Sequence, residues 1–150
     1  METKRLVVRK FRAEDGDNLH RMLSDEEVMR HLEPPFTRQR TEEFLHEAAL
    51  CDSPLIWAVD DHQGRFVGYV IYHPYDQQAY ELGWVLCREA WHKGYAHELT
   101  QGMIAYSKGR TEELVIECAP QQTASKRIAL GNGFVYQGNQ DGCEVYRRKL

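Results

Sequence analysis

The sequence of 150 residues contains no long apolar run, which limits where the protein can reside. No window approaches the about 18 apolar residues that a membrane-spanning helix requires. The amino terminus, METKRLVVRKFR, alternates apolar and charged residues and lacks the continuous apolar core of a secretory signal. These absences predict a soluble, cytoplasmic protein that has no membrane partner.

The chain also lacks an excess of positive charge and a metal-binding pattern. Its 19 Lys and Arg against 23 Asp and Glu give a net charge of -4, which argues against nucleic acid as a partner. No C-x-x-C pair is present, and His92 and His97 lie further apart than the i, i+4 spacing that puts two ligands on one helical face. We therefore expect no metal site, and we expect reduced cysteines that serve in packing: Cys51, Cys87, Cys118 and Cys143.

The first fifty residues carry one strand pattern followed by signals for helices. Residues 4–12 alternate apolar and charged side chains, as a strand does. Ser24 and Glu27 match the S-x-x-E capping box, which predicts a helix that starts there and ends at Pro34-Pro35. Thr37 is the expected N-cap of a further helix. This part of the chain is therefore predicted to be mostly helical.

From Leu55 the apolar period changes to two. LIWAVDD, RFVGYVIYHP and residues 80–86 predict three consecutive antiparallel strands. A helix is expected between Gly94 and Gly109, followed by a buried strand in LVIECAP, a short helix at residues 125–130 and a hairpin about Asp141-Gly142. The order β-α-α-β-β-β-α-β-α-β-β indicates one α+β domain, residues 1–150, with a mostly antiparallel sheet of six or seven strands flanked by helices.

The segment WHKGYAH joins a predicted strand to a predicted helix through one glycine, Gly94. A strand that enters a helix through a glycine loop directs unpaired backbone N–H groups and the positive end of the helix dipole at one point. The segment is neither a Walker P-loop nor the G-x-G-x-x-G of dinucleotide folds. Local sequence alone leaves two interpretations open, an anion site and a simple turn.

Three segments carry a resemblance to a known family. YELGWVLCREAWHKGYAHELTQGMIAYS resembles the acetyl-CoA-binding segment of the GNAT superfamily of N-acetyltransferases, in which a bulged strand precedes a Q/R-x-x-G-x-G/A loop; Gly94 and Ala96 match its small positions, and Trp91 departs from it. APQQTASKRIALGNGF resembles a second signature of the family. LEPPFTRQRTEEFL resembles the ribosomal-protein N-terminal (alanine/serine) acetyltransferase subgroup. The resemblance implies a GNAT-like fold and acetyl-CoA as cosubstrate.

Residue roles follow from this resemblance. It implies cofactor contacts from the backbone of one strand, from the glycine loop, from a glutamine that replaces the usual asparagine, and from a serine: Trp84, Val85, Leu86; His92, Lys93, Gly94, Tyr95, Ala96, His97; Gln122; and Ser125. For catalysis, Glu117 matches a position used as the base in some members, Glu81 is the alternative, and Ser125 offers a hydroxyl. Ala129 stands where many members have a tyrosine acid.

The implied activity is acetyl transfer to a primary amine, on a peptide N-terminus or a small molecule, directly within a ternary complex. We expect the acceptor cleft at residues 29–36, 72–75 and 139–142, and a monomer or homodimer. A second interpretation is a non-catalytic acyl-CoA-binding or protein-interaction module on the same fold, which Ala129 and Gln122 favour.

Overall fold

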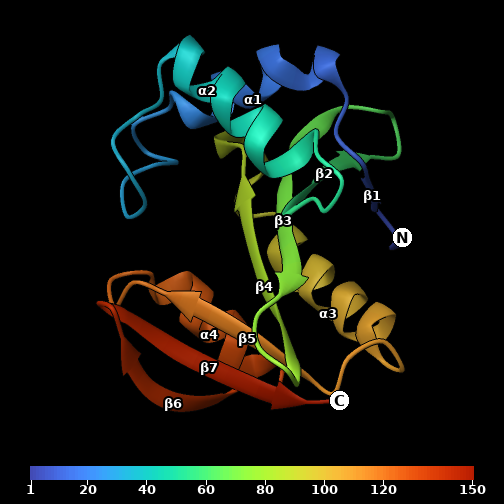
Figure 1. The fold of residues 1–150 in the computed structure, drawn as a ribbon, viewed down its shortest axis with the longest axis vertical. Coiled ribbons are helices and arrows are strands. Elements are labelled where there is room, and N and C mark those ends of the chain that lie inside the picture. Colours follow the sequence, from blue (N-terminus) through green and yellow to red (C-terminus); the bar gives the residue numbers. More distant parts are fainter.

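A computed structural model describes all residues, 1–150, as one seven-stranded sheet with helices on both faces (Figure 1). The strands follow the order β1-β2-β3-β4-β5-β7-β6. The elements in chain order are β1 Leu6–Arg9, α1 Gly16–Leu23, α2 Arg38–Phe44, β2 Ile56–Asp61, β3 Phe66–Pro74, β4 Ala79–Leu86, α3 Tyr95–Ser107, β5 Glu113–Cys118, α4 Thr123–Gly131, β6 Val135–Gln140 and β7 Cys143–Lys149. This confirms the α+β class, and the order of elements matches the predicted one, although the first helix lies at Gly16–Leu23 instead of starting at Ser24.

All neighbouring strands are antiparallel except β4 and β5, which are parallel. The three successive strands β2, β3 and β4 form the predicted meander, and Gln140 pairs with Cys143 across the predicted Asp141-Gly142 turn. The short helical turns Ala13–Asp15, Leu45–Ala49 and Arg88–Ala90 complete the elements.

The two faces of the sheet are covered by different helices. Tyr69 of β3 packs its ring against Phe11 and Phe44, on the side of α1 and α2. Tyr72, three residues along the same strand, points to the opposite face, where its hydroxyl lies 2.9 Å from Ser107 Oγ of α3. The helix α4 packs beside α3 on this second face. The sheet therefore separates an α1/α2 side from an α3/α4 side.

The helix expected to start at Ser24 is absent, which corrects the sequence prediction. Ser24 instead ends α1, where its N–H donates to the carbonyl of His20 at 2.8 Å. The competing residue is Asp25, whose carboxylate accepts the N–H of Glu27 at 3.0 Å and pairs with Arg88. Because these bonds hold the chain in successive turns, residues 24–36 form a loop rather than a helix.

Other local predictions fare unevenly. Thr37 caps α2 as expected, since its Oγ1 accepts the N–H of Arg40 at 3.1 Å. The first strand is shorter than predicted and spans only Leu6–Arg9. All four cysteines are free; Cys87 and Cys118 are buried as expected, whereas Cys51 is exposed and therefore has no packing role.

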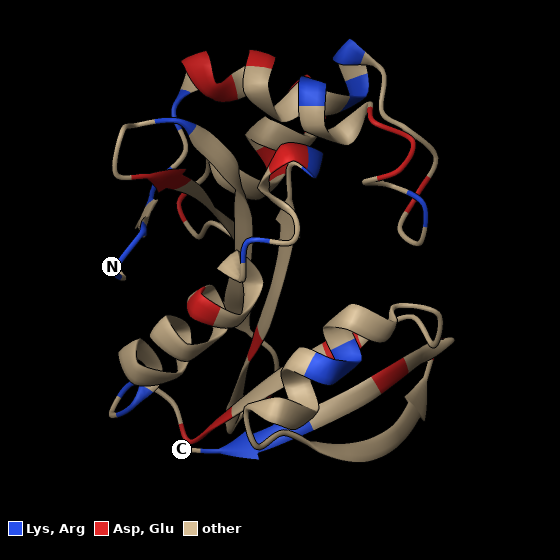
Figure 2. Cartoon of the chain, turned by 180° about the vertical axis from the view of Figure 1, so that it is seen from behind, with Lys and Arg blue, Asp and Glu red and all other residues tan.

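Charged residues of both signs are interspersed over the molecule. In Figure 2 acidic and basic segments alternate over most of the molecule, and the longest basic run seen there is the end of β7, Arg147 to Lys149. None of the helices combines the length and the apolarity that crossing a membrane requires.

Candidate active site

The sheet opens between its two central strands. Parallel pairing of β4 with β5 is limited to three residue pairs and ends at Glu81 and Val115. Beyond them β4 pairs only with β3, and β5 pairs only with β7. The two strands diverge in Figure 1, so the later part of β4 presents one unpaired backbone edge to the gap.

The ladder between β3 and β4 determines which backbone amides face this gap. Its register is continuous, so the predicted bulge is absent from this pairing; the opening arises from the divergence of β5 instead. The N–H of Cys87 donates to Val67, and that of Tyr75 donates to Ala79, at 2.9 Å each. Because hydrogen-bonded pairs alternate along an antiparallel ladder, the N–H of Val85 points to β3, and those of Trp84 and Leu86 point to the gap.

A cavity of about 710 Å³ lies at this opening. It is bounded by the end of β4, the start of α3, the start of α4 and the loop that follows α1. This volume is in the range of sites for small molecules and cofactors. Ten of the predicted cofactor residues line it: Trp84, Val85, Leu86, His92, Gly94, Tyr95, Ala96, His97, Gln122 and Ser125. Lys93 alone among the predicted contacts does not.

The start of α3 forms the polar end of the cavity. Gly94 is the N-cap and has φ 80°, a left-handed conformation that favours glycine. The first helical hydrogen bond runs from the N–H of Glu98 to the carbonyl of Gly94, at 3.1 Å. The N–H groups of the three preceding residues, Tyr95 to His97, therefore have no partner within the helix and point out of its positive end. This arrangement favours the anion interpretation of WHKGYAH.

Neighbouring side chains fix the loop around this helix end. The indole N–H of Trp91 donates to the carbonyl of Leu86 at 3.0 Å, so the tryptophan ties the loop to the end of β4. Asn132 Nδ2 lies 3.2 Å from Nδ1 of His97. When that amide donates, the other ring nitrogen of a neutral His97 carries the proton and is a donor.

Gln122 is partly engaged within the protein. Its side-chain oxygen accepts the N–H of Ala119 at 2.7 Å, which closes the turn between β5 and α4. Its amide NH₂ has no protein partner and is left to contact a ligand. Ser125 lies in the first turn of α4 and lines the cavity.

The two candidate bases lie together on the α1/α2 side of the sheet. Glu81 faces His73 across the β3–β4 pair, with Oε2 3.8 Å from the imidazole Nε2. Burial raises the pKa of Glu81; His73 lowers it in part, and the charge of Glu117 raises it again. Tyr75 joins this group, because burial and then Glu117 raise the pKa of its hydroxyl. Neither glutamate lines the cavity itself.

Sequence reasoning missed several residues of the cavity wall. Trp91 departs from the loop motif of the family, and its bond to Leu86 has no signal in the sequence. The loop after α1 contributes Glu27 and Val28 as well as His31 and Leu32, which lie within the expected acceptor segment. The remaining lining residues flank predicted ones: Ala90, Gln121, Thr123, Ala124 and Ile128.

Comparison with known proteins identifies the class to which this fold and site belong. Residues 5–135 match the family described as Acetyltransferase (GNAT) domain. The chain belongs to this family, and it is an N-acetyltransferase.

Particular relatives cover nearly the whole chain. An uncharacterized N-acetyltransferase of Bacillus subtilis (strain 168), YnaD, is 25% identical over 140 residues, which are 91% of this chain and 82% of the relative. The crystal structure of a GNAT-family acetyltransferase from Bacillus anthracis matches with a TM-score of 0.86 at 24% identity, covering 100% of this chain and 96% of the other. An acetyltransferase from Salmonella typhimurium that modifies the N-terminal serine of ribosomal protein L7/L12 matches with a TM-score of 0.82 at 17% identity, covering 99% and 96%.

Proposed function

We propose that the protein transfers the acetyl group of acetyl-CoA to a primary amine, directly and within a ternary complex. The observation that carries this proposal is the cavity at the gap between β4 and β5, where the unpaired edge of β4 meets the N-terminus of α3. The pyrophosphate suits the three free N–H groups of the helix start, and the pantetheine amides suit the edge of Trp84 to Leu86.

The oxygen of the thioester carbonyl becomes negative as the amine attacks, and it requires a donor. We assign this role to the backbone N–H of Trp84 or Leu86. The register supports these two over Val85, whose N–H is directed to Tyr69 of β3. The carbonyl of Leu86 is held by Trp91, so the indole also orients this stretch of backbone.

We assign Glu81 as the general base. An alkyl ammonium has an ordinary pKa of about 10.4 and an α-ammonium of about 7.8, so a proton must leave before attack. A carboxylate with a raised pKa is a stronger base than an ordinary one, and burial and Glu117 give Glu81 this property. His73 is its neighbour on β3, with Nε2 3.8 Å from Oε2 of Glu81 and Nδ1 2.9 Å from the Pro74 carbonyl.

The leaving group needs less assistance. A thiol has an ordinary pKa of about 8.5, so the CoA thiolate leaves readily near neutral pH. Ser125 lies on the wall of the same cavity and offers a hydrogen bond to the sulfur, and no side-chain acid is required.

For the acceptor we propose a peptide N-terminus or a small primary amine. The Salmonella relative that modifies an N-terminal serine supports the first class. The carboxylates of Glu81 and Glu117 on the acceptor side favour any ammonium group over an anionic substrate.

Isothermal titration with acetyl-CoA, followed by detection of free thiol over a panel of amines, tests this function. We expect saturable binding and thiol release with at least one amine. Absence of binding at high micromolar cofactor would contradict the proposal. Binding without release for any peptide or small amine would favour a non-catalytic acyl-CoA-binding module.

Replacing Gly94 with Ala is expected to weaken acetyl-CoA binding about tenfold, because a side chain in the left-handed region costs roughly 1–2 kcal/mol and tilts the loop away from the phosphates. Titration calorimetry measures the effect. Gly109→Ala is the matched control, since Gly109 has φ 83° at the opposite end of α3 and lies in open space. Equal affinity of the two variants for acetyl-CoA would contradict the assignment of the α3 start to the cofactor site.

A further inference from the structure

A second cavity lies along the same helix, away from the candidate active site. It has a volume of about 640 Å³ and shares no lining residue with the first cavity. Whereas the first lies at the start of α3, this one lies at the far end of that helix, next to Met103, Tyr106 and Arg110. The sheet contributes residues of β1, β2, β3 and β4 to its wall. Tyr72, His73 and Pro74 of the expected acceptor segment line it, but neither Glu81 nor Glu117 does.

Four aromatic residues line this second cavity: Trp57, Tyr72, Tyr80 and Tyr106. The ring of Tyr72 lies 4.9 Å from that of Tyr80 and 6.0 Å from that of Tyr106, measured between centroids. The polar groups of Trp57 and Tyr72 are paired inside the protein, with the Tyr72 carbonyl and Ser107 respectively. The hydroxyls of Tyr80 and Tyr106 have no protein partner and are free to donate to a ligand. A planar ring fits such a wall.

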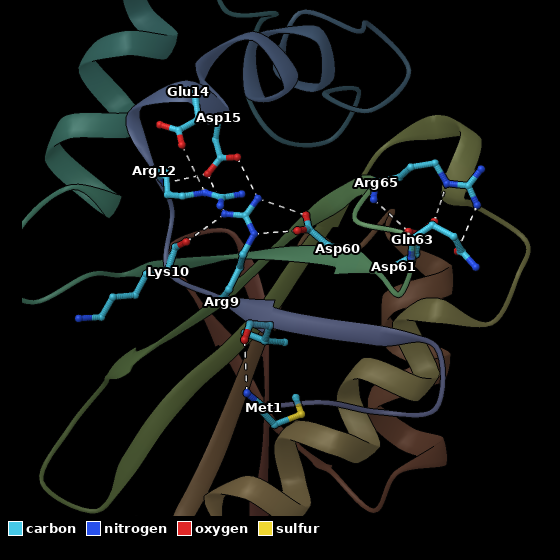
Figure 3. Close-up of polar contacts among 11 residues, drawn as sticks. Met1, Arg9, Lys10, Arg12, Glu14, Asp15, Asp60, Asp61, Gln63 and Arg65 are labelled. Carbon is cyan, nitrogen blue, oxygen red and sulfur yellow. Dashed lines mark hydrogen bonds and ion pairs between the residues drawn. The ribbon is translucent and has the colours of Figure 1, made fainter.

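The charges around the cavity are mainly positive. Arg9 is neutralised by Asp15 and Asp60, but Lys10 and Arg110 form no ion pair. Figure 3 shows the Lys10 side chain extending away from the Arg9 cluster. Asp52 is the only acidic lining residue, so two unpaired cations face one carboxylate.

Arg110 is held ready for an anion. Its guanidinium lies over the ring of Tyr106, 4.1 Å from the centroid, and its Nε donates to the Tyr106 carbonyl at 2.9 Å. That bond satisfies the carbonyl at the negative end of α3 and leaves the two terminal nitrogens without partners. A guanidinium fixed in this way is suited to binding a carboxylate through both terminal nitrogens.

We propose that this second cavity binds a small aromatic carboxylate, with the ring against the tyrosines and the carboxylate on Arg110. Three compounds that share the indole ring system and differ in side-chain charge test the proposal. They are the anion indole-3-acetate, the neutral indole-3-acetamide and the cation N,N,N-trimethyltryptammonium, which has no acetylatable nitrogen. Titration calorimetry is performed with the whole chain and saturating CoA, so that the first cavity is occupied. We expect the anion to bind about tenfold or more tightly than the neutral amide and the cation weakest.

Arg110→Met removes the charge and keeps the aliphatic stem over Tyr106, and it should abolish the preference for the anion. Arg110→Lys should retain part of it. The matched control is Arg40→Met, because Arg40 also lies over an aromatic ring, 5.0 Å from the centroid of Phe36, and forms no ion pair. Equal binding of all three indoles, tighter binding of the cation, or an anion preference that survives Arg110→Met would each overturn the proposal.

Discussion

Replacing Glu81 with Gln is expected to lower kcat by about a hundred- to ten-thousand-fold, the usual worth of a well-positioned proton transfer. The KM for acetyl-CoA should change little, because Glu81 does not line the cofactor cavity. Steady-state thiol release with one fixed amine measures both constants. The smallest loss of kcat expected on removal of the base is about a hundredfold. If kcat of Glu81→Gln stays within about threefold of that of the unchanged protein, Glu81 is excluded as the base.

Glu117→Gln distinguishes the two carboxylates. If Glu81 is the base, kcat should decrease with falling pH through a pKa above that of an ordinary glutamate. Because the charge of Glu117 contributes to that rise, its removal should move the acid limb to lower pH while activity at neutral pH persists. Loss of activity in Glu117→Gln, with only a shifted pH profile in Glu81→Gln, would reverse the assignment.

Glu81→Gln should also raise the melting temperature at pH 7. The pKa of Glu81 is raised by burial in the folded protein, so the folded state binds the proton more tightly than the unfolded chain does. The stability that this proton provides is fully present below the ordinary glutamate pKa and is lost as pH rises through the raised value. A neutral amide avoids this loss. Gain of stability together with loss of turnover is not expected of a residue with a purely structural role.

Replacing Asp15 with Ala is expected to lower the free energy of unfolding by about 3 kcal/mol, because it leaves part of a buried ion network unpaired. Figure 3 shows Arg9 between two carboxylates, with Nη1 2.9 Å from Asp15 Oδ2 and Nε 2.7 Å from Asp60 Oδ2. Asp15 is 4% exposed and also accepts the N–H of Arg12 at 2.7 Å. Chemical denaturation at pH 7 measures the change.

Glu14→Ala is the matched control, since the neighbouring Glu14 is exposed and makes only a 3.7 Å contact with Arg12; we expect a change within about 0.5 kcal/mol. Burial acts to raise the pKa of Asp15, but the bonds from Arg9 and Arg12 outweigh it and lower the value. The stabilisation is therefore present above the ordinary aspartate pKa and is lost as pH falls through the lowered one. Equal stability of the two variants at pH 7 would contradict a stabilising role of the network.

Local sequence predicted elements where a single interaction decides the conformation. The hydroxyl of Thr37 reaches an amide three residues ahead, and Asp141-Gly142 turns one strand onto the next, so both features were predictable. No helix starts at Ser24, because the carboxylate of Asp25 accepts the N–H of Glu27 and is itself bound by Arg88, 63 residues away. A pairing at that separation has no periodic signature in the sequence.

The sequence by itself determined the order of elements, the family and the loop that starts α3, because apolar period, glycine position and motif spacing are properties of neighbouring residues. Only the tertiary structure decided how the site is assembled. The divergence of β5 from β4 determines which backbone amides are free. The burial of Glu81 beside His73 and Glu117 raises its pKa and thereby favours Glu81 as the base. Strand register and burial arise from packing between distant segments, and they set both the direction of a backbone N–H and the pKa of a carboxylate.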